Sequence, residues 1–151
     1  MRSTALPPYN GAMNQTAASL PDTTPQFAAA AAFLDKLAAG DFDQLAAALE
    51  PDAQLKALLP PGYMEWTGQE AVCGAFDMFF GGMDTYEVID ATIGQVGDRL
   101  HLRWRIHARG GRLGPQDFVA EQSCYADAGP TRRLQSLALV CSGFRAQPAV
   151  V

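Results

Sequence analysis

The sequence has few of the residues that build metal sites and disulfide frameworks. Its 151 residues include three cysteines and two histidines. The cysteines, Cys73, Cys124 and Cys141, show no metal-ligand spacing. An odd cysteine count fits poorly with a secreted disulfide scaffold, so we expect a reducing, cytoplasmic location. We expect neither a metal ion nor another cofactor.

Basic residues and long apolar runs are also scarce. Lys and Arg together number 11 against 16 Asp and Glu, which gives a formal net charge of −5. This charge argues against nucleic acid and anionic membranes as partners. No apolar run approaches the ~20 residues that a membrane-spanning helix requires. The amino terminus also lacks the continuous apolar core of a signal peptide.

What the sequence does contain is one domain with the predicted order helix, helix, strand (residues 53–59), helix, and then four long strands. Residues 1–22 are rich in Ala, Pro, Ser and Thr without periodicity, which is typical of a flexible tail. Residues 23–147 carry the periodic patterns. We expect one helix that ends at Gly40, a short second helix after Asp41, and a third after Thr67. The third helix has an apolar stripe of Val72, Phe76, Phe79 and Phe80.

Long strands follow the third helix, and three turn signals predict their pairing. These signals are Gly97-Asp98, the glycine-rich segment 110–115, and the segment 127–130. Symmetric closure of each turn would place Ala91 opposite Trp104, Trp104 opposite Glu121, and Glu121 opposite Ser136. The predicted class is α+β, with a curved antiparallel sheet wrapped around three N-terminal helices.

This register would turn Glu121 toward the helices among apolar neighbours. Directly opposed residues share one face of a sheet. The predicted inner face includes Leu100, Leu102, Trp104, Ile106, Val119, Glu121, Ser123, Tyr125, Leu134, Ser136, Ala138 and Val140. Desolvation there would raise the pKa of the Glu121 carboxyl toward neutrality, where it could act as a general base.

Other residues are expected to line the same pocket. Tyr63 or Ser123 could donate a hydrogen bond to a developing oxyanion, although a tyrosine in such a segment is more often a packing residue. The predicted ligand-binding walls are Phe33, Trp66, Phe76, Leu102, Trp104, Val119, Tyr125, Ser136 and Ala138. His101 and His107 fall on the opposite face of the sheet, with Arg103 and Arg105. A catalytic role for either histidine would need a β-bulge.

The sequence resembles the SnoaL-like part of the nuclear-transport-factor-2-like superfamily. The resemblance rests on Trp66-Thr67-Gly68-Gln69-Glu70-Ala71-Val72, on Arg103-Trp104-Arg105-Ile106, and on Val140-Cys141-Ser142-Gly143-Phe144-Arg145. It implies a cone-shaped, cystatin-like roll with a pocket between sheet and helices, commonly dimeric through the outer sheet face. The cyclases of this family use a carboxylate on the penultimate long strand, and Glu121 matches that position. Their Gly-Thr-His segment is absent, because this chain has His107-Ala108-Arg109-Gly110.

Two interpretations of function follow. In the first, the protein is a cofactor-independent acid–base enzyme (isomerase, cyclase, dehydratase or hydrolase) acting on a hydrophobic carbonyl or epoxide compound, with Glu121, Tyr63 and Ser123 as catalytic residues. In the second, the same fold is a non-catalytic module that binds a small hydrophobic ligand or forms a homodimer.

Overall fold

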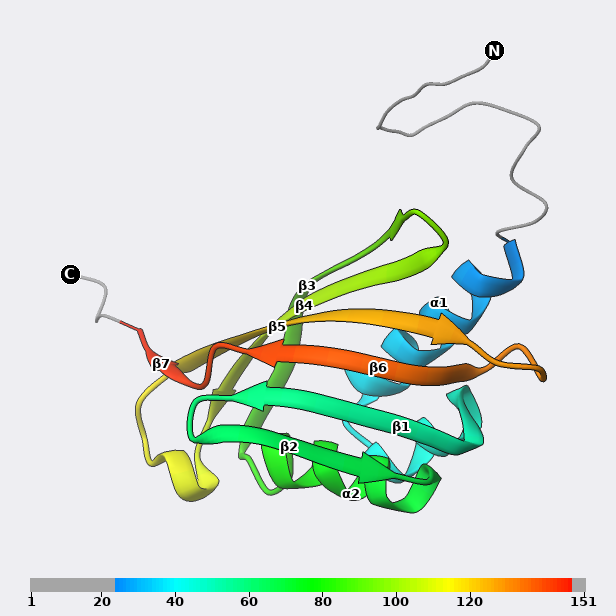
Figure 1. The fold of residues 1–151 in the computed structure, drawn as a ribbon. Helices are drawn as coiled ribbons and strands as arrows, with labels where there is room; N and C mark the ends of the chain where they lie inside the picture. The colour runs from blue at the N-terminus through cyan, green and yellow to red at the C-terminus, as the bar shows by residue number, and fades with distance from the viewer. Residues whose placement is uncertain (1–23, 148–151) are drawn as a thin grey trace, which may run out of the picture.

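The computed structural model describes residues 24–147, in which helices cover one side of a curved sheet (Figure 1). The predicted tail of residues 1–22 lies outside the described residues. The helical segments are α1 (Thr24–Ala39), the 3-10 helix η2 (Phe42–Ala48), α2 (Gln69–Phe80) and the 3-10 turn η3 (Gly111–Leu113). The strands are β1 (Leu49–Leu59), β2 (Gly62–Thr67), β3 (Thr85–Val96), β4 (Arg99–Arg109), β5 (Phe118–Ala128), β6 (Leu134–Cys141) and β7 (Arg145–Ala146).

The strands form one mixed sheet. Their order is β2-β1-β6-β5-β4-β3, and β7 pairs with β5. β1 and β6 run parallel, whereas the other pairs are antiparallel. The α+β class and the curved sheet around helices are therefore confirmed, but the sheet is mixed instead of antiparallel throughout. Turn signals join only strands that follow one another, so they carry no information on the pairing of β1 with β6.

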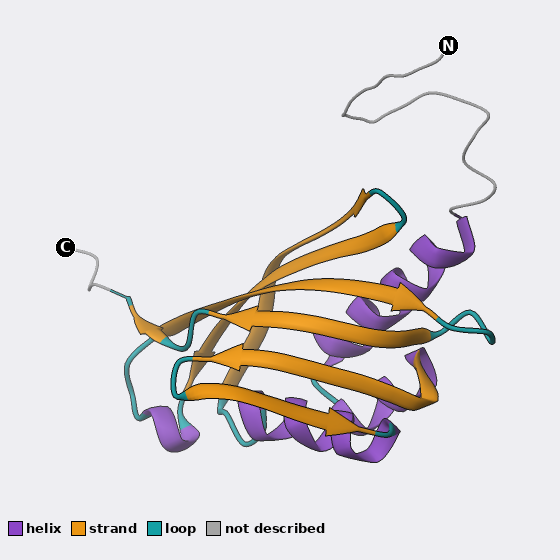
Figure 2. Ribbon diagram, viewed as in Figure 1, coloured by secondary structure: helices purple, strands orange, loops and turns teal. Residues whose placement is uncertain are grey.

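The helices pack on one face of the sheet and enclose the core (Figure 2). The predicted apolar stripe of α2 is confirmed, because all four of its residues are buried. On α1 the most deeply buried large side chains are Phe33 and Leu37. β4 buries alternate residues, as a strand covered on one side should: Leu100, Leu102, Trp104, Ile106 and Ala108.

The β3–β4 hairpin has the register that its Gly97-Asp98 turn predicts. Ala91 pairs with Trp104 in the structure, which confirms that expectation. Gly97 adopts φ 61°, the left-handed conformation that favours glycine in tight hairpin turns.

The β4–β5 register differs from the prediction by one residue. Trp104 pairs with Gln122, and Glu121 pairs with Arg105. The connecting loop does not close symmetrically, because the N–H of Gly110 donates to the carbonyl of Gly114 (2.8 Å) around the 3-10 turn η3. A one-residue shift moves every side chain of a strand to the other face. Gln122 therefore faces the helices, and Glu121 faces away from them.

β6 follows β5 to the other face. Tyr125 pairs with Ala138 and Asp127 with Ser136, instead of Glu121 with Ser136. Residues of β5 and β6 that were predicted to share a face do share one. Relative to β4, however, both strands present the opposite face to the helices from the one predicted. The residues of β5 and β6 that meet the helices include Cys124, Leu137 and Leu139.

A buried carboxylate joins β1 to the turn between β5 and β6. Glu50 is 1% exposed. It accepts hydrogen bonds from the backbone N–H of Thr131 (2.8 Å), from the Thr131 hydroxyl (2.6 Å) and from the N–H of Arg133 (3.2 Å). The Thr131 hydroxyl contributes most to lowering the pKa of Glu50 below its ordinary value. Gly129 leaves room for this side chain, since a Cβ there would lie 2.6 Å from Cγ of Glu50.

Glu50→Gln should make folding less stable at neutral pH and remove part of the acid sensitivity of the protein. A depressed pKa in the folded state stabilises the protein above the unfolded-state value of about 4.3. That contribution is lost as the pH falls through the lower folded-state pKa. Thermal unfolding from pH 7 to pH 3 should show a lower Tm for the variant at pH 7 and a difference that shrinks below about pH 4.

The matched control is Asp35→Asn, which removes one charge from an exposed position on α1. A Tm difference for Glu50→Gln that is the same at pH 7 and pH 3 would contradict the proposed role of the Glu50 carboxylate.

Candidate functional site

Three aromatic rings meet in the interior between the helices and the sheet. Phe33 of α1, Phe76 of α2 and Trp104 of β4 are each at most 1% exposed. Their ring centroids lie 5.6 Å (Phe33–Phe76), 5.8 Å (Phe33–Trp104) and 6.3 Å (Phe76–Trp104) apart. These are distances at which aromatic pairs attract one another. The structure thus brings together three of the predicted wall residues, and their role in ligand binding stays a prediction.

Gln122 places one amide beside this cluster. It lies opposite Trp104 in the β4–β5 pair and is 0% exposed. The indole Nε1–H of Trp104 donates a hydrogen bond of 2.8 Å to Oε1 of Gln122. Nε2 of Gln122 is buried without a hydrogen-bond partner among residues 24–147. A buried donor left unsatisfied costs about 1–3 kcal/mol, so this amide is a chemically distinct point in an apolar interior.

The interior holds no evident proton-transfer group within the described part of the chain. Its buried polar or charged residues are Glu50 and Gln122. Glu50 is occupied by the turn after β5. The inward Cys124 thiol stays protonated at neutral pH, because burial raises its pKa to about 12. We call the interior that the three rings and the Gln122 amide fill the chamber; it is apolar apart from that amide.

A line of aromatic contacts leads from the surface to this chamber. Trp66 of β2 is half-buried, and its ring lies 5.8 Å from that of Phe79. Phe79 in turn lies 5.5 Å from Phe76 at the centre of the cluster. Among the predicted wall residues, Trp66 and Leu102 therefore also belong to this side of the sheet, and Leu102 is fully buried.

Glu121 lies outside this chamber, so its predicted inward position is wrong. Its side chain is 41% exposed on the face away from the helices, with Oε1 3.4 Å from Nη2 of Arg105. The one-residue difference in the β4–β5 register is the cause. At this exposure the carboxylate is in contact with water instead of enclosed by apolar walls.

Ser123, Tyr125, Ser136 and Ala138 also lie on the outer face, contrary to the prediction. Oγ of Ser123 is 2.8 Å from Nε2 of His101, and the Tyr125 ring packs 4.7 Å from the His101 ring. The hydroxyl of Ser136 donates to Oδ2 of Asp127 (2.8 Å). These side chains belong to a polar surface network.

Val119 and Tyr63, both predicted to line the pocket, also point away from the helices. Val119 pairs with His107 on the outer face and is half-buried there. Tyr63 is 56% exposed and lies opposite the outward Leu58. Its hydroxyl donates to Oε2 of Glu65 (2.6 Å), which raises the pKa of Tyr63. Neither residue reaches the interior.

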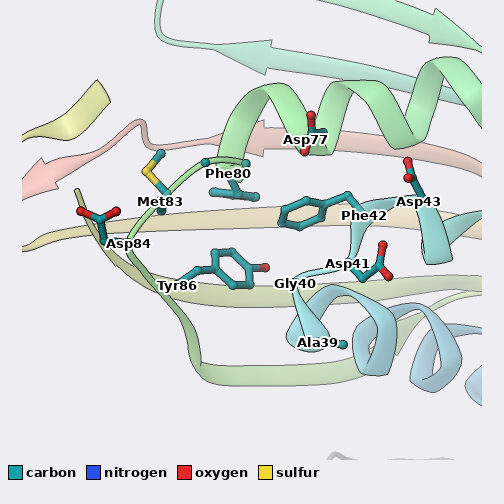
Figure 3. A pocket seen from close by; sticks show the side chains of 12 residues that line it. Ala39, Gly40, Asp41, Phe42, Asp43, Asp77, Phe80, Met83, Asp84 and Tyr86 are labelled. Carbon is teal, nitrogen blue, oxygen red and sulfur yellow. The ribbon is translucent and has the colours of Figure 1, made fainter. Parts of the chain in front are cut away.

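A separate cleft of about 590 Å³ opens beside the end of α1 (Figure 3). Four exposed aspartates line it: Asp41, Asp43, Asp77 and Asp84. Its aromatic residues are Phe42, Phe80 and Tyr86, and the Tyr86 hydroxyl donates to the carbonyl of Leu37 (2.7 Å). No group of three potential metal ligands occurs in the described chain. The cleft is an electronegative, solvated surface that the sequence patterns did not indicate, because its acids come from three separate segments: the start of η2, the last turn of α2 and the bend before β3.

No helix within residues 24–147 is long and apolar enough to cross a membrane.

The order of the elements and the curved sheet with helices on one face define a class of small α+β roll. A sequence model of the SnoaL-like domain matches residues 30–142. The chain therefore belongs to the SnoaL-like domain family. A search of curated proteins found no match.

Solved structures share this fold at low sequence identity. A candidate polyketide cyclase from Xanthomonas campestris pv. campestris is 14% identical, with a TM-score of 0.62 over 79% of this chain and 91% of that one. A protein with a ketosteroid isomerase-like fold from Catenulispora acidiphila, solved with trimethylamine, is 13% identical, with a TM-score of 0.59 over 74% and 82%. A candidate ketosteroid isomerase from Kribbella flavida is 16% identical, with a TM-score of 0.55 over 87% and 88%. These likenesses show the fold.

Replacing Glu121 by Ala should change the free energy of unfolding by about 1 kcal/mol or less, because its ion pair with Arg105 is exposed to water. Replacing Phe76 by Ala should cost about 3–5 kcal/mol, because it empties the centre of the ring cluster. Urea unfolding followed by circular dichroism measures both. A loss of several kcal/mol in the Glu121 variant would contradict its outer position.

Proposed function

We propose that this protein binds a small, largely apolar molecule in the chamber around Phe33, Phe76 and Trp104, without acid–base turnover. The observation that carries the proposal is the composition of the inward face. It combines aromatic rings with one neutral amide, whereas Glu121, His101 and His107 lie on the opposite face. Binding sites for small molecules are typically apolar with a few polar groups that fix orientation.

The fold supports this proposal over one based on Glu121. The structurally similar proteins carry the names of polyketide cyclase and ketosteroid isomerase candidates, which suggests an apolar carbonyl compound as the molecule. An isomerase or cyclase needs a base within hydrogen-bond reach of the proton that it removes. Glu121 is separated from the chamber by the sheet itself, so the non-catalytic interpretation accounts better for this chain.

Entry of the molecule requires the aromatic side chains to move. The rings of Phe76 and Phe79 fill the path between the half-buried Trp66 and the chamber. Buried rings can change rotamers without unfolding the domain. A bound molecule that packs against the displaced rings would then replace the ring–ring contacts that were lost.

A bicyclic ketone should quench the fluorescence of Trp104 in a saturable way. The experiment uses 2-acetylnaphthalene and the Trp66→Phe variant, in which Trp104 is the remaining tryptophan. Chromatography after prolonged incubation should recover the ketone unchanged. The control is Glu121→Gln in the same background, which should bind with the same affinity, because the carboxylate lies outside the chamber.

Absence of saturable quenching would contradict the binding proposal. Conversion of the ketone by the wild-type chain, lost in Glu121→Gln, would restore the acid–base interpretation.

A second proposal concerns the outer face, where an exposed apolar row crosses three strands. Tyr63, Leu58 and Val140 are neighbours across β2, β1 and β6, and each is more than half exposed. Ala138 and Tyr125 extend this row toward β4. Contiguous exposed apolar residues with a charged rim are typical of association surfaces. We propose that this row is the centre of a homodimer interface.

Val140→Glu should convert the dimer to a monomer, because it places a charge in the middle of the apolar row. Sedimentation at micromolar concentration measures the change in mass. Val96→Glu is the matched control, since Val96 is 57% exposed but lies at the end of the edge strand β3. A wild-type chain that sediments as a monomer, or a Val140→Glu variant that remains dimeric, would contradict this interface.

A further inference from the structure

A second cleft, of about 390 Å³, lies on the outer face of the sheet, away from the helices. It lies where two irregularities interrupt the regular strands. The first is in β3, whose register against β4 shifts between Val88 and Asp90. The shift leaves Ile89 as an extra residue, 46% exposed, in one wall of the cleft. Such β-bulges change the direction of a side chain and are frequent beside functional sites.

The turn after β6 builds the other wall. The hydroxyl of Ser142 accepts a hydrogen bond from the backbone N–H of Glu121 (2.9 Å) and donates one to the carbonyl of Gly143 (2.7 Å). Gly143 has φ 75°, a left-handed conformation that favours glycine. The chain then returns to β5, where Arg145 of β7 pairs with Val119. Opposed residues share one face of a sheet, so the Arg145 side chain lies on the outer face and lines the cleft.

Two arginines and one glutamate determine the charge of this cleft. Arg105 of β4 and Arg145 of β7 contribute two positive charges, and Glu121 of β5 contributes one negative charge. Glu121 lies 3.4 Å from Arg105, whereas charge-assisted hydrogen bonds of this type are typically about 2.7–2.9 Å long. The Arg145 guanidinium takes part in none of the ion pairs among residues 24–147. The cleft therefore has an excess of positive charge and guanidinium donors that its neighbours leave largely unused, in a chain whose net charge is −5.

We propose that this cleft binds a small organic monocarboxylate with an apolar body, such as an arylacetate. A guanidinium binds a carboxylate through two parallel hydrogen bonds, which gives both strength and orientation. The half-buried Val119 and the exposed Ile89 supply apolar contacts for the body of the ligand. Glu121 repels a second negative charge, so a monoanion fits the cleft better than a dianion such as phosphate.

This site differs from the two sites proposed above in place and in chemistry. It lies on the opposite side of the sheet from the chamber, and its ligand is charged instead of neutral. It also shares no residue with the apolar row of the proposed homodimer interface. A result against one of these sites leaves the other two standing.

Three related probes test the recognition of charge and of the apolar body. Phenylacetate has both, 2-phenylacetamide has the same shape without the charge, and acetate lacks the ring. Titration calorimetry on the full chain at low ionic strength should show phenylacetate binding about tenfold more tightly than either of the others. That factor is the expected effect of one charge-assisted hydrogen bond or of partial burial of the ring.

A second measurement on the wild-type chain locates the bound molecule without any variant. The backbone amide NMR signals of Ser142 and Arg145 should shift in a saturable way as phenylacetate is added, because both residues line the cleft.

Arg145→Gln should weaken phenylacetate binding about tenfold, because a neutral side chain cannot form the charged pair. Arg103→Gln is the matched control, since Arg103 is exposed on the same strand as Arg105 but lies outside the cleft. It removes the same charge and should leave the affinity at the wild-type value. Glu121→Gln should strengthen binding about two- to fivefold, because Arg105 then has no competing carboxylate.

Absence of saturable phenylacetate binding to the wild-type chain would overturn this inference. Equal affinities for phenylacetate and either of the other probes would overturn the proposed class of ligand. NMR shifts confined to residues around Trp104 would place the molecule in the interior and overturn the site. An unchanged affinity in Arg145→Gln, or weaker binding in Glu121→Gln, would also contradict the roles of these two residues.

Discussion

The pairing of Trp104 with Gln122 across β4 and β5 determines which side of the later strands meets the helices. It joins the largest buried side chain to the one buried side-chain amide in the described chain by a 2.8 Å hydrogen bond. A shift by one residue would bury Glu121 and Ser123 and expose Gln122 and Cys124. Burying a charged carboxylate is costly, so the observed register is strongly preferred.

This register sorts the charged residues to one side of the sheet. Arg99 binds Asp127 through two hydrogen bonds of 3.1 and 3.0 Å, and Asp117 contacts both His107 and Arg109. Partial burial alone would raise the pKa of Asp127, but the hydrogen bonds from Arg99 and Ser136 outweigh it and lower the pKa. The outer surface is thus a network of compensating charges, whereas the inner chamber is neutral. A neutral interior suits a neutral ligand and gives little support to proton transfer.

Local sequence patterns predicted the elements that are determined by residues close together in the chain. The apolar stripe of α2 and the two-residue turn at Gly97-Asp98 were sufficient for a buried helix and for the β3–β4 register. The loop after Arg109 was not predictable in the same way, because its 3-10 turn adds one residue without a distinctive sequence signal. That single residue moved Glu121 out of the candidate site and Gln122 into it. A one-residue error in register leaves the predicted fold class correct, but it changes which residues are assigned to the site.

The contact between Glu50 and Thr131 links residues 81 positions apart in the chain. It stands beside the parallel pairing of β1 with β6, which joins equally distant segments. Contacts of such large sequence separation require closure of a long loop before they stabilise anything, and they slow folding. During synthesis the amino-terminal hairpin of β1 and β2 therefore has an open edge until almost the whole domain has left the ribosome. This half of the sheet is where the nascent chain is most exposed to aggregation.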